Sequence, residues 1–207
     1  MGHSLRSWAC VSAVLAAAPL AAVPRTFVVD PAASSVRIHV GKSGAFSFAG
    51  HKHEVVAPAL SGEVTADAAD LAASRVAVTF EAAALKVLPE GEPPGDPPKV
   101  EEAMRGPKVL DAARFPDIRF KSLRVSGRAA GGGAYDLELV GELALHGVTR
   151  PLTLPVHVEI AGDTLTATGK AVLRHDQFGM QPVSAAGGAV KVKNEIALDY
   201  RIVARAR

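Results

Sequence analysis

The stretch GELALHGVTRPLTLPVHVEI, from Gly141 to Ile160, contains two alternating runs joined by a short polar link. The first run extends back to residue 137, and one of its faces carries only leucine and glycine: Leu137, Leu139, Gly141, Leu143 and Leu145. One face of the second run is equally apolar: Leu152, Leu154, Val156, Val158 and Ile160. Alternation with period two is typical of a strand with one buried and one solvated face. The pattern predicts a long antiparallel hairpin, with residues 146–151 as its turn.

The composition of the chain limits the class of protein. Its 207 residues suit one large β domain, and 48% of them are hydrophobic although only 5% are aromatic. We therefore expect a core built mainly from Val, Leu, Ile and Ala. The formal net charge of +2 comes from interspersed positive and negative residues, which gives no reason to expect a nucleic-acid partner.

The N-terminus has the pattern of a secretory signal. Arg6 precedes an uncharged run from Trp8 to Ala22, which is short for a membrane span and typical of a signal peptide. We expect residues 1–22 to be removed on export, so that the mature protein is periplasmic or secreted and has no stable membrane span. The sole cysteine, Cys10, lies in the same run, so the mature domain would be stabilised by packing rather than by disulfides.

Short alternating segments fill most of the remaining chain. They predict strands within residues 26–30, 35–40, 60–65, 75–83, 118–121, 164–173 and 190–203. The proline-rich segment Pro89–Pro98 is expected to be a surface loop that forms no helix. Lys99–Arg105 is the one convincing helix, and Gly127–Gly133 is expected to be a loop.

The sequence predicts about eight to ten strands and a single short helix. A parallel βαβ sheet needs a helix between successive strands, so this fold is not expected. A two-layer sandwich and a closed barrel both fit the pattern, and the hairpins favour a barrel because it has no edge strands. An eight-stranded barrel can enclose one small ligand. The many Ala and Gly residues on the inward faces would leave an apolar cavity, unless bulkier neighbours fill it.

Four segments, in order along the chain, resemble the YceI-like proteins. They are FVVDPAASSV (Phe27–Val36), PKVLDAARFPDIRFKS (Pro107–Ser122), LALHGVTRPLTL (Leu143–Leu154) and RHDQFGM (Arg174–Met180). The resemblance implies an all-β fold, an antiparallel lipocalin-like barrel of about eight strands with one short helix, over residues 26–207. It also implies a periplasmic protein that binds a polyisoprenoid or isoprenoid quinone as ligand, with no other cofactor.

The chain departs from this family in two places. Residues 46–53 replace the bend with a G-x-F pattern that the family usually has in its first long hairpin. A proline-rich insertion followed by Lys99–Met104 replaces the family's usual helix start. The helix is expected to cap one end of the barrel, so this second departure bears on the ligand more than on the fold.

A metal site is one alternative hypothesis. His51 and His53 are two residues apart and would share one face of a strand, with Glu54 on the other. A zinc site would need a third ligand, for which His39 and His175 are the candidates. If such a site formed, the protein would be a metal-binding protein or a metal-dependent enzyme centred on His51 and His53. A solvated hairpin end is the simpler interpretation, and we assign no metal ligand.

Catalysis finds little support in the sequence. The mature domain has no cysteine and no Gly-x-Ser-x-Gly motif, and no Ser/His/Asp set stands out. His146 lies in the expected turn, where a structural hydrogen bond is the simpler role. We therefore expect no catalytic residue and a binding protein rather than an enzyme.

Alternation instead predicts a set of ligand-binding residues inside the barrel. The residues expected to line the interior are Val36, Ile38, Val78, Phe80, Ile118, Phe120, Leu139, Leu143, Leu165 and Leu198, with Met104, Leu110 and Phe178 at the mouth. Such a site would carry or buffer an apolar lipid. The remaining alternative is a filled barrel that acts as a stress or interaction module, and the loops would allow a homodimer.

Overall fold

The structure, a computed structural model, describes residues 23–43, 53–58, 60–181, 184–185 and 190–207. Its strands are β1 (Arg25–Val29), β2 (Ser35–Ser43), β3 (His53–Val56), β4 (Leu60–Ala66), β5 (Arg75–Glu81), β6 (Lys86–Val87), β7 (Asp117–Gly131), β8 (Ala134–Leu145), β9 (Val148–Ala161), β10 (Thr164–Arg174), β11 (Ser184–Ala185) and β12 (Val190–Ala206). The helices of this described part are α1 (Asp96–Arg105) and the 3-10 turns η2 (Leu71–Ala73), η3 (Ala82–Ala84) and η4 (His175–Phe178).

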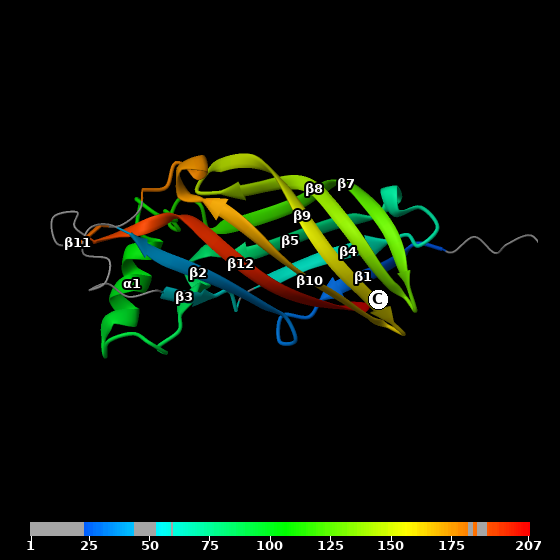
Figure 1. Ribbon diagram of the computed structural model, residues 1–207, viewed down its shortest axis with the longest axis horizontal. Coiled ribbons are helices and arrows are strands. Elements are labelled where there is room, and N and C mark those ends of the chain that lie inside the picture. The colour runs from blue at the N-terminus through cyan, green and yellow to red at the C-terminus, as the bar shows by residue number, and fades with distance from the viewer. Residues whose placement is uncertain (1–22, 44–52, 59, 182–183, 186–189) are drawn as a thin grey trace, which may run out of the picture.

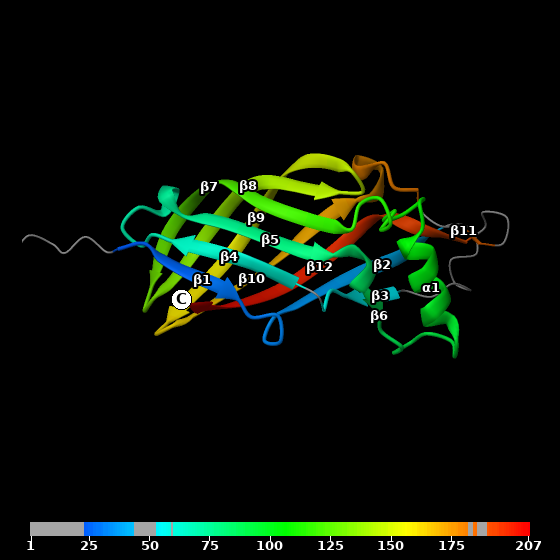
Figure 2. The same ribbon diagram turned by 180° about the vertical axis from the view of Figure 1, so that it is seen from behind.

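Eight strands close into an antiparallel barrel (Figures 1 and 2). They follow the order β1–β4–β5–β7–β8–β9–β10–β12, and β12 pairs in turn with β1, where Phe27 lies opposite Ala206. The two ends of the sheet are thus hydrogen-bonded to each other. This closure confirms the predicted antiparallel barrel and excludes the sandwich.

Strand β12 is 17 residues long and pairs with three major strands of the wall. One edge pairs with β10, and the other pairs with β1 near the C-terminus and with β2 further back. Beyond β2 the wall continues through β3 to the short β6. In Figure 1, α1 lies at this end of the barrel, whereas the β7–β8 and β9–β10 turns lie at the opposite end.

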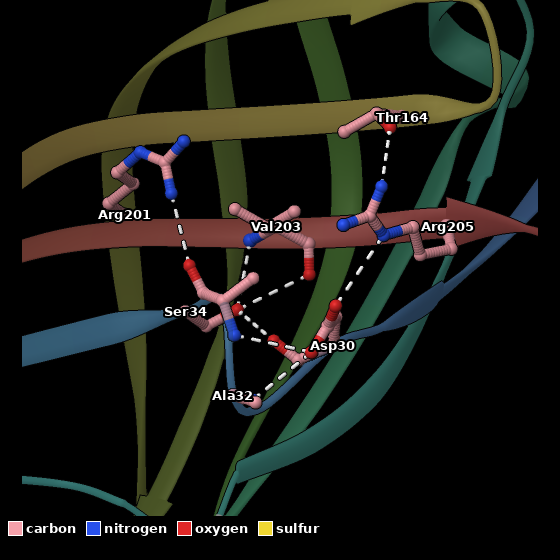
Figure 3. A network of polar contacts seen from close by, with 8 residues as sticks. Asp30, Ala32, Ser34, Thr164, Arg201, Val203 and Arg205 are labelled. Atoms are coloured by element: carbon pink, nitrogen blue, oxygen red, sulfur yellow. Dashed lines mark hydrogen bonds and ion pairs between the residues drawn. The ribbon is translucent and has the colours of Figure 1, made fainter.

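The bend between β1 and β2 is fixed by side chains of the Asp-Pro-x-x-Ser segment (Figure 3). One carboxylate oxygen of Asp30 accepts hydrogen bonds from the backbone N–H groups of Ala32 and Ala33. The Ser34 hydroxyl donates to the Asp30 carbonyl at 2.7 Å and accepts from the Val203 N–H at 2.9 Å. The bend is therefore attached to β12 where the partner of β12 changes from β1 to β2.

The β8–β9 hairpin has a shorter turn than the sequence predicted. Only His146 and Gly147 lie outside the strands, and Leu145 pairs directly with Val148. Both turn residues have positive φ, 53° and 73°, as a two-residue type I′ turn requires. The predicted six-residue link was wrong because the sequence marked positive φ only at the glycine, and histidine also tolerates it.

Two other boundaries differ from the sequence prediction. The helix begins at Asp96, so Pro97 and Pro98 lie in its first turn, where the missing N–H groups have no helical partner to lose. Residues 127–131 belong to β7 rather than to a loop. Gly127 is needed there because an added Cβ would lie 2.2 Å from the Asp136 carbonyl oxygen of the paired strand.

His146 connects three of the four family-like segments. Its Nδ1 lies 3.0 Å from the Phe178 carbonyl oxygen, and its Nε2 lies 3.2 Å from that of Pro107. The Phe115 ring meets the imidazole edge-on, with ring centroids 5.8 Å apart. These contacts confirm the structural hydrogen-bonding role that was predicted for His146.

We predict that Ser34→Ala lowers the free energy of unfolding by about 1–2 kcal/mol, because it leaves the Val203 N–H without its acceptor. Ser35→Ala is the matched control, since Ser35 is the next residue and is exposed. Urea unfolding of both variants measures the difference. Equal stability of the two variants would show that the bend does not depend on this hydroxyl.

Candidate ligand cavity

A cavity of about 590 Å³ runs inside the barrel and is lined almost entirely by apolar side chains. Every residue that alternation placed in the interior lines it, as do two of the three expected at the mouth: Val36, Ile38, Val78, Phe80, Ile118, Phe120, Leu139, Leu143, Leu165, Leu198, Met104 and Leu110. The structure thus brings these residues together around one space. Their role in binding a ligand stays a prediction.

Phe178 lies elsewhere. Its side chain is 2% exposed and packs into the core from η4, but it is not among the residues that line the cavity. Its carbonyl oxygen faces His146. The residue therefore supports the wall beside the β8–β9 turn rather than the mouth.

The sequence-based set omitted further lining residues that the same alternation marks. The inward face of β9 contributes Leu152, Leu154, Val156, Val158 and Ile160. Strand β10 contributes the small residues Ala167 and Ala171, which fits the expectation that small inward side chains leave space. Helix α1 adds Val100 and Ala103, which no strand pattern could indicate.

Glycine leaves room for two aromatic rings on the inside of the wall. An added Cβ on Gly141 would lie 2.7 Å from the Phe120 ring, and one on Gly169 would lie 2.2 Å from the Tyr200 hydroxyl. Tyr200 crosses β10 at Gly169 and donates a hydrogen bond to the Pro155 carbonyl on β9 at 2.9 Å. The β9–β10 ladder ends at Gly169 and Val156, so this hydroxyl supplies a donor where the strands separate.

Helix α1 is attached to the barrel through Glu101. This carboxylate accepts hydrogen bonds from the Lys86 ammonium at 3.1 Å, from the Val87 N–H at 3.1 Å and from Arg105 at 2.8 Å. Burial alone would raise the pKa of Glu101, but these three donors hold it below its usual value. The bond to Val87 also joins helix α1 to the backbone of the short strand β6. The face of α1 with Val100 and Met104 thereby lies against the cavity.

The histidines of the metal hypothesis do not form a ligand set in the described residues. His51 lies outside those residues. His53 lies 2.7 Å from a Glu92 oxygen, whereas His39 pairs with Asp199 and His175 with the Asn194 carbonyl oxygen. Burial lowers the pKa of His175. Among the residues that the structure describes, no group of three or more His, Cys, Asp or Glu side chains has an arrangement that could hold a metal ion.

The fold and the cavity define the class: a closed antiparallel β-barrel with an apolar interior. The model of the YceI-like domain matches residues 27–204, so the chain belongs to this family. A UPF0312 protein of Vibrio parahaemolyticus is 27% identical over 153 residues, which cover 73% of this chain and 72% of the relative.

Solved structures show the same fold. Burkholderia cenocepacia BcnA has a TM-score of 0.64 at 22% identity, and the match covers 84% of this chain and 98% of BcnA. A polyisoprenoid binding domain from Saccharophagus degradans has a TM-score of 0.63 at 12% identity, covering 87% of this chain and 98% of that domain. In the part of the chain that the structure describes, none of the helices has the length and hydropathy needed to cross a membrane.

We predict that Tyr200 ionises far above the usual range, because burial raises its pKa to about 12 from an ordinary value of 10.0. The fold favours the neutral phenol, so this stabilisation is complete below pH 10 and is lost as the pH rises towards 12. Tyr200→Phe should lower the free energy of unfolding by about 1 kcal/mol at neutral pH. It should also remove the loss of stability between pH 10 and pH 12.

Tyrosinate absorbance during alkaline titration, together with urea unfolding at each pH, measures both effects. Tyr135→Phe is the matched control, because it removes the chain's other tyrosine. This variant should keep the tyrosine ionisation near pH 12 and the loss of stability that accompanies it. Ionisation of both tyrosines at about pH 10 would contradict a buried, hydrogen-bonded Tyr200.

Proposed function

We propose that the protein binds an apolar lipid, a polyisoprenoid or an isoprenoid quinone, inside the barrel and carries or buffers it without catalysis. The observation that carries this proposal is the 590 Å³ cavity with its apolar lining. Ligand pockets of roughly 300–1,000 Å³ hold small molecules with most of their surface buried. A flexible chain of repeated apolar units suits a long interior that offers few polar partners.

The energetics favour such a guest. Each CH₂-sized group transferred from water gains about 0.8 kcal/mol, so roughly ten to fifteen buried groups gain about 8–12 kcal/mol before the losses of association. An empty apolar cavity also lacks the dispersion contacts that its lining would otherwise make. Binding can therefore be tight with hardly any specific polar contact.

The relatives support the ligand class. The Saccharophagus degradans domain with the same fold is described as polyisoprenoid binding. The signal predicted at residues 1–22 lies outside the described residues, and with the family resemblance it supports a periplasmic or secreted location. A homodimer stays a prediction, and a metal-dependent role has no described ligand set in its favour.

The remaining alternative, a filled barrel that serves only as a stress or interaction module, is opposed by the cavity. The small side chains of Ala167 and Ala171 leave space on the inner surface of β10, whereas the space at Gly169 is taken by Tyr200. Filling that surface artificially distinguishes the two hypotheses, because it should matter only if the interior accepts a guest.

We predict that Ala171→Phe weakens the binding of a long isoprenoid at least tenfold, because the ring occupies space in the cavity. Val172→Phe is the matched control: it places the same ring on the next residue of β10, where Val172 is 61% exposed on the outer face. Its affinity should match that of the wild type. Quenching of intrinsic fluorescence or native mass spectrometry with an isoprenoid alcohol measures the dissociation constants.

Equal loss of affinity in both variants, or no loss in either, would contradict binding inside the barrel. Circular dichroism and urea unfolding check that each variant keeps the fold, since overpacking can cost about 1–3 kcal/mol.

A further inference from the structure

A histidine–glutamate pair lies at the α1 end of the cavity. His53 begins β3, lines the cavity and stands opposite Val40 of β2. Glu92 belongs to the proline-rich segment between β6 and α1. The two side chains meet with 2.7 Å between Nδ1 of His53 and Oε1 of Glu92. Figure 2 shows β3, β6 and α1 together at this end of the barrel.

The contact with Glu92 indicates which nitrogen of His53 carries the proton. The Glu92 side chain is 1% exposed, and a carboxylate can only accept hydrogen bonds. With Glu92 ionised, Nδ1 of His53 donates to it. In the neutral imidazole this leaves Nε2 as an acceptor, on the ring edge that points away from Glu92. No hydrogen bond between described residues uses that nitrogen.

The charged side chains that the described residues place at this end disfavour an anionic guest. Asp96 and Lys99 also line the cavity here, and the Lys99 ammonium is paired with Asp96 at 3.1 Å. Glu92 adds a second carboxylate, and its Oε2 is buried without a hydrogen-bond partner in the described structure. Of these three described side chains, two are carboxylates and one is an ammonium, so a phosphate placed beside them is repelled more than it is attracted. A quinone carbonyl would meet the lone pair of Nε2, whereas a hydroxyl group would complete a hydrogen bond.

Resting on the proposed lipid-binding function, we propose that the ligand ends in a neutral hydroxyl group, as in a long isoprenoid alcohol or phenol, which donates to Nε2 of His53. The lipid lies with its polar end beneath α1 and its chain along the barrel. Glu92 is a positioning residue that holds the imidazole in the accepting tautomer. The proline-rich insertion thus selects the polar end of the ligand, while the strands accommodate its chain.

The first test compares three ligands with the same chain: an isoprenoid alcohol, its methyl ether and its monophosphate. The wild type should bind the alcohol about tenfold more tightly than the ether, the factor expected for one hydrogen bond, and the monophosphate more weakly still. His53→Phe should bind alcohol and ether equally, with the ether affinity unchanged. Glu54→Gln is the matched control on the same strand, because Glu54 pairs with Arg37 away from the cavity, and it should keep the preference.

A second measurement needs no variant that might misfold. Nitrogen-15 spectra of the wild type distinguish the two neutral tautomers of His53. The proposal requires a protonated Nδ1 and an unprotonated Nε2 whose resonance moves when the alcohol binds and does not move with the ether. A protonated Nε2, in either the neutral or the charged ring, or a resonance that the alcohol leaves unchanged, would overturn the assignment of the polar end.

The ligand series also separates this inference from the function on which it rests. Equal and tight binding of alcohol and ether by the wild type would overturn the hydroxyl site and leave the lipid-binding proposal intact. Failure of the wild type to bind either ligand would overturn both. Tightest binding of the monophosphate would overturn the proposal of a neutral hydroxyl end and would indicate an anionic lipid instead.

Discussion

The whole structure depends on the closure of the sheet by β12. This strand pairs with β10 on one edge and with β1 and β2 on the other. Each of the eight strands in the circuit therefore has a hydrogen-bonded neighbour on both sides. Because closure leaves no free edge in the circuit, the wall is held by its own ladder, and its centre need not be filled as a sandwich core must. The hollow interior follows from small inward residues on a wall that is stable for other reasons.

The four family-like segments supply several of the contacts that hold that wall together. Asp30 and Ser34 attach the β1–β2 bend to β12, and the His146–Gly147 turn aligns β8 with β9. His146 then connects this turn to residues of the second and fourth segments. Membership of the family accordingly says more about how the barrel is built than about what it contains. The cavity is shaped instead by residues outside these contacts, such as Ala171 and Tyr200.

Strand alternation made the inward face predictable. On β8 and β9 one apolar face per strand had to turn away from water, and the cavity lining follows that face from Leu137 to Ile160. The contacts between distant residues were not predictable in the same way. The His53–Glu92 pair joins residues 39 positions apart, and the Tyr200–Pro155 bond depends on the register of two ladders. Local exceptions, such as positive φ at His146 and prolines inside α1, were missed although local rules allow them, because histidine tolerates a positive φ and prolines fit the first turn of a helix.

The hollow interior of the barrel is the proposed site for an apolar guest. Native mass spectrometry of the protein purified from a membrane-containing host, followed by extraction with organic solvent, tests it most directly. We expect a stoichiometric apolar adduct of several hundred daltons or more, which the solvent removes and an added isoprenoid alcohol restores. A bare protein mass both before and after incubation with isoprenoid alcohols and quinones would contradict it.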